Sequence, residues 1–251
     1  MIKRWLPLLY LAALVIGMPL AAYGQADGIP AISLSVDSAS TPEQLSNTIQ
    51  IVILITILSL APSILIMTTS FTRIVVIFHF LRQAIGTQNA PSNQILISLA
   101  LFLTFFIMNP VLQEVNTNAL RPYLDDEIEQ QEALALASEP IKEFMVYHTR
   151  DKDLALFAGY YQDQQAESPA DLSLAVVVPA FMINELRIAF QIGFMLYLPM
   201  LLIDMVVSAV LMSLGMMMLP PVMISMPFKI LLFVLVDGWY LVVESIINGL
   251  R

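Results

Sequence analysis

The stretch that decides the fold class runs from Ile49 to Met67 and reads IQIVILITILSLAPSILIM. It contains no charged residue. As a helix it reaches about 28 Å, close to the roughly 30 Å hydrocarbon core of a bilayer. Three more long apolar stretches follow, at 94–111, 188–211 and 222–247. Together they predict an all-α membrane protein built from long helical hairpins.

The composition of the 251-residue chain agrees with this prediction. Hydrophobic residues make up 58% of the chain and charged residues 12%, whereas typical globular domains have about 45–50% and about 25%. The formal net charge of −9 argues against nucleic acid as a partner, because phosphate binding requires clustered Lys and Arg. The sequence contains no Cys, which excludes disulfides, thiolate metal sites and thiol catalysis.

Residues 1–24 have the pattern of a secretory signal peptide. Lys3 and Arg4 precede an apolar stretch, and small residues near Gly24 offer a cleavage site. The alternative is a retained membrane anchor, but the apolar stretch is short for a span and contains Pro7 and Pro19. Residues 25–47 are polar and predict an N-terminal tail.

A first hydrophobic hairpin is expected over residues 48–111. Within it, residues 71–85 predict an amphipathic helix that lies on a membrane surface or against a neighbouring subunit. Arg73 and Arg82 flank the polar stripe of this helix. The positive-inside rule places these two basic residues on the cytoplasmic side.

Residues 112–186 predict an acidic helical insert on the periplasmic side. Apolar residues recur in it at helical spacing, and Phe144 and Phe157 are expected to pack inside it. The acidic run 125–127 is better explained as a solvated surface than as a metal site, because no His or second carboxylate cluster stands at ligand spacing. We therefore expect neither a metal ion nor a cofactor.

A second hydrophobic hairpin is expected over residues 187–251, with a Met-rich turn at 212–221. Charged residues inside or beside its apolar stretches are the first candidates for function, since isolated charges are costly in lipid. They are Glu185, Arg187, Asp204, Lys229 and Asp237. Asp204 and Lys229 are the most plausible pair, and structural ion pairing is favoured over a proton relay.

The sequence gives little support for an enzyme. Asp204 and Asp237 invite comparison with an intramembrane aspartyl protease, but Asp237 stands in the sequence VDGW rather than in a Gly-x-Gly-Asp context. The sequence shows no nucleophile elbow and no glycine-rich phosphate loop. We expect a protein that is not an enzyme and has no catalytic residue.

The methionines are more informative. Met216, Met217 and Met218 are consecutive, and Gly215 and Pro220-Pro221 bound them. Ordinary core filling explains scattered Met, but three consecutive residues on a turn cannot all face one core. If several copies met around an axis, these turns would form a soft hydrophobic pore constriction.

Several motifs resemble the FliP family, the export-gate subunits of bacterial flagellar type III secretion, which is related to an injectisome branch. They are LAPSILIM at 60–67, TSFTRIV at 69–75, FLRQAIGT at 80–87, LFLTFFIM at 101–108, AFQIGF at 189–194, GMMMLPPVMISMPFK at 215–229 and FVLVDGW at 233–239. In the acidic insert only LALF at 154–157 is similar.

The resemblance implies a pentameric ring of such subunits with FliR-like and FliQ-like subunits and other export-apparatus membrane proteins. It also implies a location in the bacterial inner membrane, in the flagellar basal body, with a periplasmic portion. The turn from Gly215 would match the methionine constriction of the family's channel. Glu185 would match an acidic position near subunit contacts, and Phe157 an aromatic residue of the periplasmic hairpin.

The leading prediction is thus a channel-forming structural subunit that passes unfolded flagellar proteins across the inner membrane. The alternative is a proton-coupled membrane carrier that uses Asp204, Lys229 and Asp237. Such carriers usually show internal repeats, and we find no convincing repeat in this sequence.

Overall fold

The computed structural model describes residues 42–87, 89–161, 168–216 and 218–250, and every regular element in these ranges is helical. The predicted signal peptide and residues 25–41 of the predicted tail lie outside the described residues. The chain divides into two units, Met1–Leu54 and Ile55–Arg251. Everything below concerns the second unit unless a range says otherwise.

The helices are, in chain order, α2 (Pro42–Thr68), α3 (Phe71–Ile85), α4 (Asn93–Val115), α5 (Arg121–Leu124), α6 (Gln130–Tyr147), α7 (Asp151–Tyr161), α8 (Leu174–Ser213), α9 (Pro221–Leu235) and α10 (Gly238–Asn248). A π-helical turn, η2 (Asn116–Leu120), joins α4 to α5, and a 3₁₀ turn, η3 (Pro169–Asp171), precedes α8. The all-α prediction is confirmed for the described residues.

Three stretches are long and apolar enough to cross a membrane. They are Ile51–Thr68, Asn93–Leu124 and Leu174–Ser213, and α9 with α10 forms a fourth if the 63° bend between them is accepted within one span. At 40 residues, α8 is about 60 Å long, roughly twice the thickness of a hydrocarbon core. It therefore extends well beyond a single perpendicular crossing.

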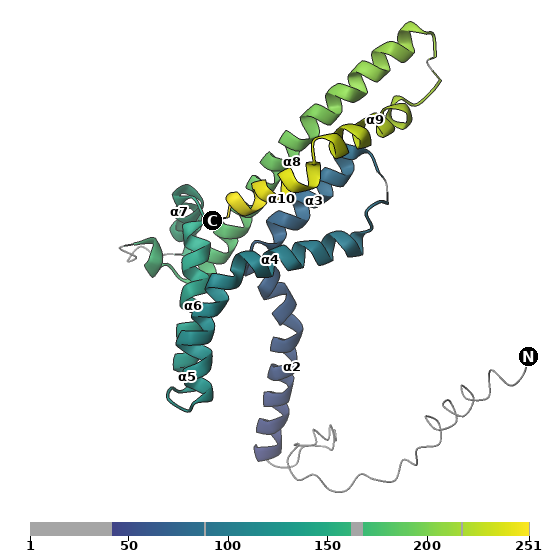
Figure 1. Cartoon of the computed structure of the whole chain (residues 1–251). Helices are drawn as coiled ribbons and strands as arrows, with labels where there is room; N and C mark the ends of the chain where they lie inside the picture. Colours follow the sequence, from purple (N-terminus) through teal and green to yellow (C-terminus); the bar gives the residue numbers. More distant parts are fainter. Residues whose placement is uncertain (1–41, 88, 162–167, 217, 251) are drawn as a thin grey trace, which may run out of the picture. The chain divides into compact units, whose positions relative to one another are not determined.

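Helix α3 forms the centre of the core. It packs against α8, α4 and α9, and Figure 1 shows α8, α9 and α10 beside it. Ile74, Ile77 and Phe78 of α3 are fully buried. The predicted helix 71–85 thus appears with the same bounds, and its apolar face is already covered by its own chain. Arg73, predicted as a basic residue on the cytoplasmic side, is buried with that face.

The predicted boundary between residues 186 and 187 falls inside α8. The N-terminal part of α8 contacts α6 and α7, whereas its C-terminal part forms a hairpin with α9. Helix α8 continues through this position. Asn184 and Glu185 bond to the His148 carbonyl and to Arg73, and Arg187 bonds to Asn184 and Gln191 within α8.

Hydroxyl groups satisfy the C-terminal carbonyls of α2. Thr68 donates to the Ile64 carbonyl at 2.9 Å, Thr69 to Leu65 at 2.6 Å and Thr72 to Ile66 at 3.0 Å. The last carbonyls of a helix have no intrahelical partners, and in an apolar environment no water is present to donate a hydrogen bond to them. The hydroxyls in the sequence TTSFT at 68–72 therefore provide partners for three carbonyls near the end of α2.

Candidate functional site

The methionine turn joins α8 to α9 and has a defined backbone. The Met216 N–H donates to the Leu211 carbonyl at 3.0 Å, and the Gly215 N–H donates to Met212 at 3.1 Å. Gly215 has φ +75°, which glycine adopts without steric cost. This is the Schellman arrangement, which satisfies the last carbonyls of a helix. Pro221 then opens α9.

The described methionines of this turn do not belong to the core. Met218 is 98% exposed and Met216 is 42% exposed. Nothing lies within 4 Å of a Cβ placed on Gly215. Met217 lies outside the described residues. Ordinary core filling therefore does not explain Met216 and Met218 within one copy of the chain.

Asp204 of α8 and Lys229 of α9, the two helices that the turn joins, form an ion pair. The Lys229 Nζ lies 2.7 Å from the Asp204 Oδ2 and 3.2 Å from the Ala84 carbonyl in the last turn of α3. Ser225 donates from its hydroxyl to the Asp204 Oδ1. Since Lys229 is only 2% exposed, this cluster connects α8, α9 and α3 through one buried ammonium.

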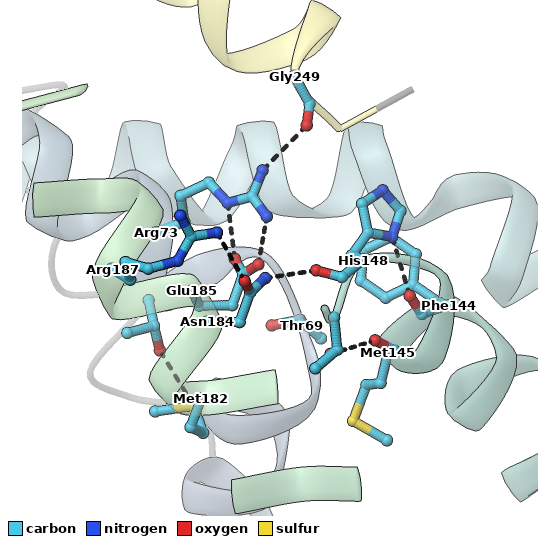
Figure 2. A network of polar contacts seen from close by, with 12 residues as sticks. Thr69, Arg73, Phe144, Met145, His148, Met182, Asn184, Glu185, Arg187 and Gly249 are labelled. Atoms are coloured by element: carbon cyan, nitrogen blue, oxygen red, sulfur yellow. Dashed lines mark hydrogen bonds and ion pairs between the residues drawn. The ribbon is translucent and has the colours of Figure 1, made fainter. Parts of the chain in front are cut away.

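Arg73 and Glu185 form a second, more deeply buried ion pair, shown in Figure 2. The Arg73 Nε donates to the Glu185 Oε2 at 2.9 Å, and its Nη2 contacts the other carboxylate oxygen. The Nη1 donates to the Gly249 carbonyl at 3.0 Å. Arg73 thus fixes α3 to α8 and to the chain just beyond α10.

Asn184 extends this cluster towards the C-terminal end of α6. Its amide donates to the His148 carbonyl, and its side-chain oxygen accepts from the Arg187 Nη2 at 3.0 Å (Figure 2). Arg187 also donates to Gln191 at 3.1 Å. Asn184 therefore connects α8 to the end of α6.

His148, the residue that follows α6, lies next to this cluster. Burial lowers the pKa of His148, and the nearby Arg73 guanidinium lowers it further. Hydrogen bonds with the Phe144 and Leu250 backbones act in the opposite direction but are outweighed. The neutral imidazole is therefore the form that suits this position.

The remaining predicted residues lie apart from these pairs. Arg82 donates to Asn93 across the α3–α4 loop, and Phe144 packs edge-on against Phe181 with ring centroids 6.1 Å apart. Phe157 is half-buried against the core. Asp237 is exposed at the start of α10 with φ +51°, and the described residues provide no ion pair for it. The structure therefore does not bring Asp237 together with Asp204 and Lys229.

Sequence reasoning missed the pairing of Arg73 with Glu185, because 112 residues separate them. It used Arg73 to assign the cytoplasmic side of the membrane, and it placed Glu185 beside an apolar stretch. A usable signal was present, since both charges stand in otherwise apolar helices that need partners. Across the described ranges, no group of three or more His, Asp or Glu side chains is placed to hold a metal ion.

Known proteins similar to this chain point to one family. The model of the FliP family matches residues 54–246. The flagellar biosynthetic protein FliP of Bacillus subtilis (strain 168) is 58% identical over 216 residues, which cover 86% of this chain and 98% of that protein.

Two further relatives with the same description are 48% identical to this chain. The Aquifex aeolicus (strain VF5) protein matches over 223 residues, 88% of this chain and 92% of its own length. The Caulobacter vibrioides protein matches over 234 residues, 93% and 86% respectively. The resemblance found in the motifs is thereby confirmed, and the chain belongs to the FliP family.

Proposed function

We propose that this chain is a channel-forming structural subunit of the flagellar type III protein-export gate. In this role it passes unfolded flagellar proteins across the bacterial inner membrane as one of several copies in a ring with FliR-like and FliQ-like subunits. The relatives' description as flagellar biosynthetic proteins supports the cellular process. The acidic insert would then form the periplasmic portion.

One observation carries the channel role: the Met turn is exposed at the junction of α8 and α9. Exposing large apolar side chains to water is unfavourable, so such side chains mark a surface that another molecule covers. Met is flexible and polarizable, which suits contact with varied polypeptide surfaces. Around an axis, Met216, Met217 and Met218 of several copies would close the channel at rest and yield when a polypeptide enters.

Met218 should contact the exported chain directly. Because the sequence contains no Cys, M218C introduces a unique thiol. In cells that assemble the whole apparatus, an export substrate stalled by a folded domain and carrying single Cys residues should cross-link to M218C. The matched control is L124C, at a position on α5 that is 67% exposed but far along the chain from the turn. Equal cross-linking at both positions, or none at M218C, would contradict the proposal.

The carrier alternative assigns Asp204, Lys229 and Asp237 to proton movement. The contacts of Lys229 with Asp204 and with the end of α3 favour a structural connection, and Asp237 lies apart from that pair. Subunit composition after extraction in mild detergent separates the two functions. A gate subunit purifies in a multi-copy hetero-assembly, whereas a carrier is complete as a monomer or dimer.

A further inference from the structure

Exposed methionines gather at the tip of the α8–α9 hairpin. Within the turn and on either side of it, the exposed side chains are those of Met212, Met216, Met218 and Met223. Met108 of α4 and Met145 of α6 lie in the core instead. Within one copy of the chain, a water-borne reagent therefore reaches thioether sulfur at the tip but not in the core.

Thioether sulfur is the only sulfur that this chain offers to an oxidant. The sequence contains 15 Met and no Cys, so no thiol of the chain competes for the reagent. When hydrogen peroxide meets a methionine, a sulfur lone pair attacks one peroxide oxygen and the O–O bond breaks. The sulfur loses two electrons and keeps that oxygen as a sulfoxide, while the other oxygen leaves with both peroxide hydrogens as water. A flexible apolar side chain thereby becomes a polar one.

The turn has room for this product. Met218 is 98% exposed, and the space around a Cβ placed on Gly215 is open. The hydrogen bond from Met216 to Leu211 that helps to end α8 is between backbone groups, so a change of side chain does not remove it. A sulfoxide on Met145 would instead place a polar group in the core, which is costly. Oxidation at the tip therefore changes the surface of the turn and leaves the core intact.

We propose that Met216 and Met218 form an oxidation site at which hydrogen peroxide converts the hydrophobic seal into a wettable one. The inference rests on the proposed function, since only a ring of several copies would bring these turns together as a constriction. A hydrophobic constriction holds back ions and small solutes by dewetting. Sulfoxide oxygens accept hydrogen bonds from water, so an oxidised gate would fill with water and leak without losing its fold.

The rate of sulfoxide formation tests the chemistry of the site. The purified complete assembly in lipid vesicles is treated with dilute hydrogen peroxide, and mass spectrometry follows each methionine of this chain. Met218 should be oxidised at least about tenfold faster than Met145, because reactivity follows exposure. Equal rates, or slower oxidation of Met218 because neighbouring copies shield it, would overturn the inference.

Permeability tests the consequence of oxidation. The same vesicles contain a small fluorescent solute, and its release is compared before and after peroxide for each variant. Release from the wild-type assembly should rise at least about fivefold after peroxide, because the constriction becomes wettable. M216L/M217L/M218L should show no rise, since Leu has apolar bulk but no sulfur to oxidise.

The matched control is M195L, which removes a methionine of α8 that is 72% exposed but lies outside the turn. Its assembly should respond to peroxide as the wild type does. Unchanged release from the wild type, a rise that persists in the triple Leu variant, or a loss of the response in M195L would each reject the oxidation site.

These outcomes are separate from the test of the proposed function. An assembly that stays sealed after peroxide would still cross-link a stalled substrate at M218C. A chain without that cross-link would fail the proposed function whatever the rate at which Met218 is oxidised.

Discussion

At the scale of single residues, the charges inside apolar helices act as connections between helices. Arg73 joins α3, α8 and the end of α10, and Lys229 joins α9, α8 and α3. Each is almost fully buried, so the partner carboxylate and carbonyl replace the water that the cation has lost. These side chains hold the hairpin that carries the methionine turn against the core.

Neutralising one member of the Asp204–Lys229 pair should impair the protein more than neutralising both. D204N removes the negative charge and leaves a buried ammonium with only neutral acceptors such as the Ala84 carbonyl, and breaking such a pair costs about 3–5 kcal/mol. K229M should cost less, because Ser225 still donates to Asp204. The yield and thermal midpoint of the purified complex report these effects. If D204N/K229M is no better than D204N, the two charges do not compensate each other.

His148 should make the protein sensitive to mild acid. Its folded-state pKa is lowered, so below about pH 6.5 the unfolded chain binds more protons than the folded chain, and stability falls as pH decreases. Thermal midpoints of wild type and H148Q, measured between about pH 8 and pH 5, should diverge towards low pH. H79Q serves as the control because His79 is exposed. Parallel curves for wild type and H148Q would contradict the expectation.

At the scale of elements, the break between α9 and α10 is built from packing. Asp237 takes a left-handed conformation, and Gly238 allows the chain to approach the ring of Phe233 closely. Trp239 then packs edge-on against Phe233 and Phe78, with centroids 5.6 and 6.2 Å away. The two helices bend by 63° at this break, and Trp239 at the start of α10 contacts Phe78 of α3.

A side chain on Gly238 should disturb this break. The Cβ of G238A would lie 2.2 Å from Phe233, so the ring must move and Trp239 with it. We expect a loss of about 1–3 kcal/mol, typical of overpacking, together with a shifted Trp fluorescence spectrum. G159A is the matched control, because nothing lies within 4 Å of that Cβ in α7. Equal stability of G238A and G159A would show that the close approach is not needed.

The helices themselves were largely predictable from the sequence, but which residues of different helices pair with one another was not. Long uncharged stretches predict apolar helices, and the polar stripe of residues 71–85 predicts α3 with its observed bounds. The pairing of Arg73 with Glu185 depends on how α3 crosses α8, which no local pattern specifies. The bond from Asn184 to the His148 carbonyl likewise depends on how α8 packs beside the end of α6.

At the scale of the whole molecule, the exposed apolar surface exceeds what one copy can cover. Leu58 of α2, Phe102 of α4 and Val234 of α9 are each at least 65% exposed. Lipid and neighbouring subunits are the two media that suit such surfaces. This agrees with the proposal that the chain functions in an assembly, where the methionine turns of several copies would meet.

The most direct measurement of the central claim is small-molecule permeability of cells whose gate carries Ala at Met216, Met217 and Met218. Shorter side chains should leave a wettable gap, so the account predicts a leak of ions or small solutes while assembly and much of export survive. The matched Leu variant should keep the seal, because its side chains retain apolar bulk. Normal permeability of the Ala variant together with a reduced yield of complex would indicate ordinary packing residues and would contradict the account.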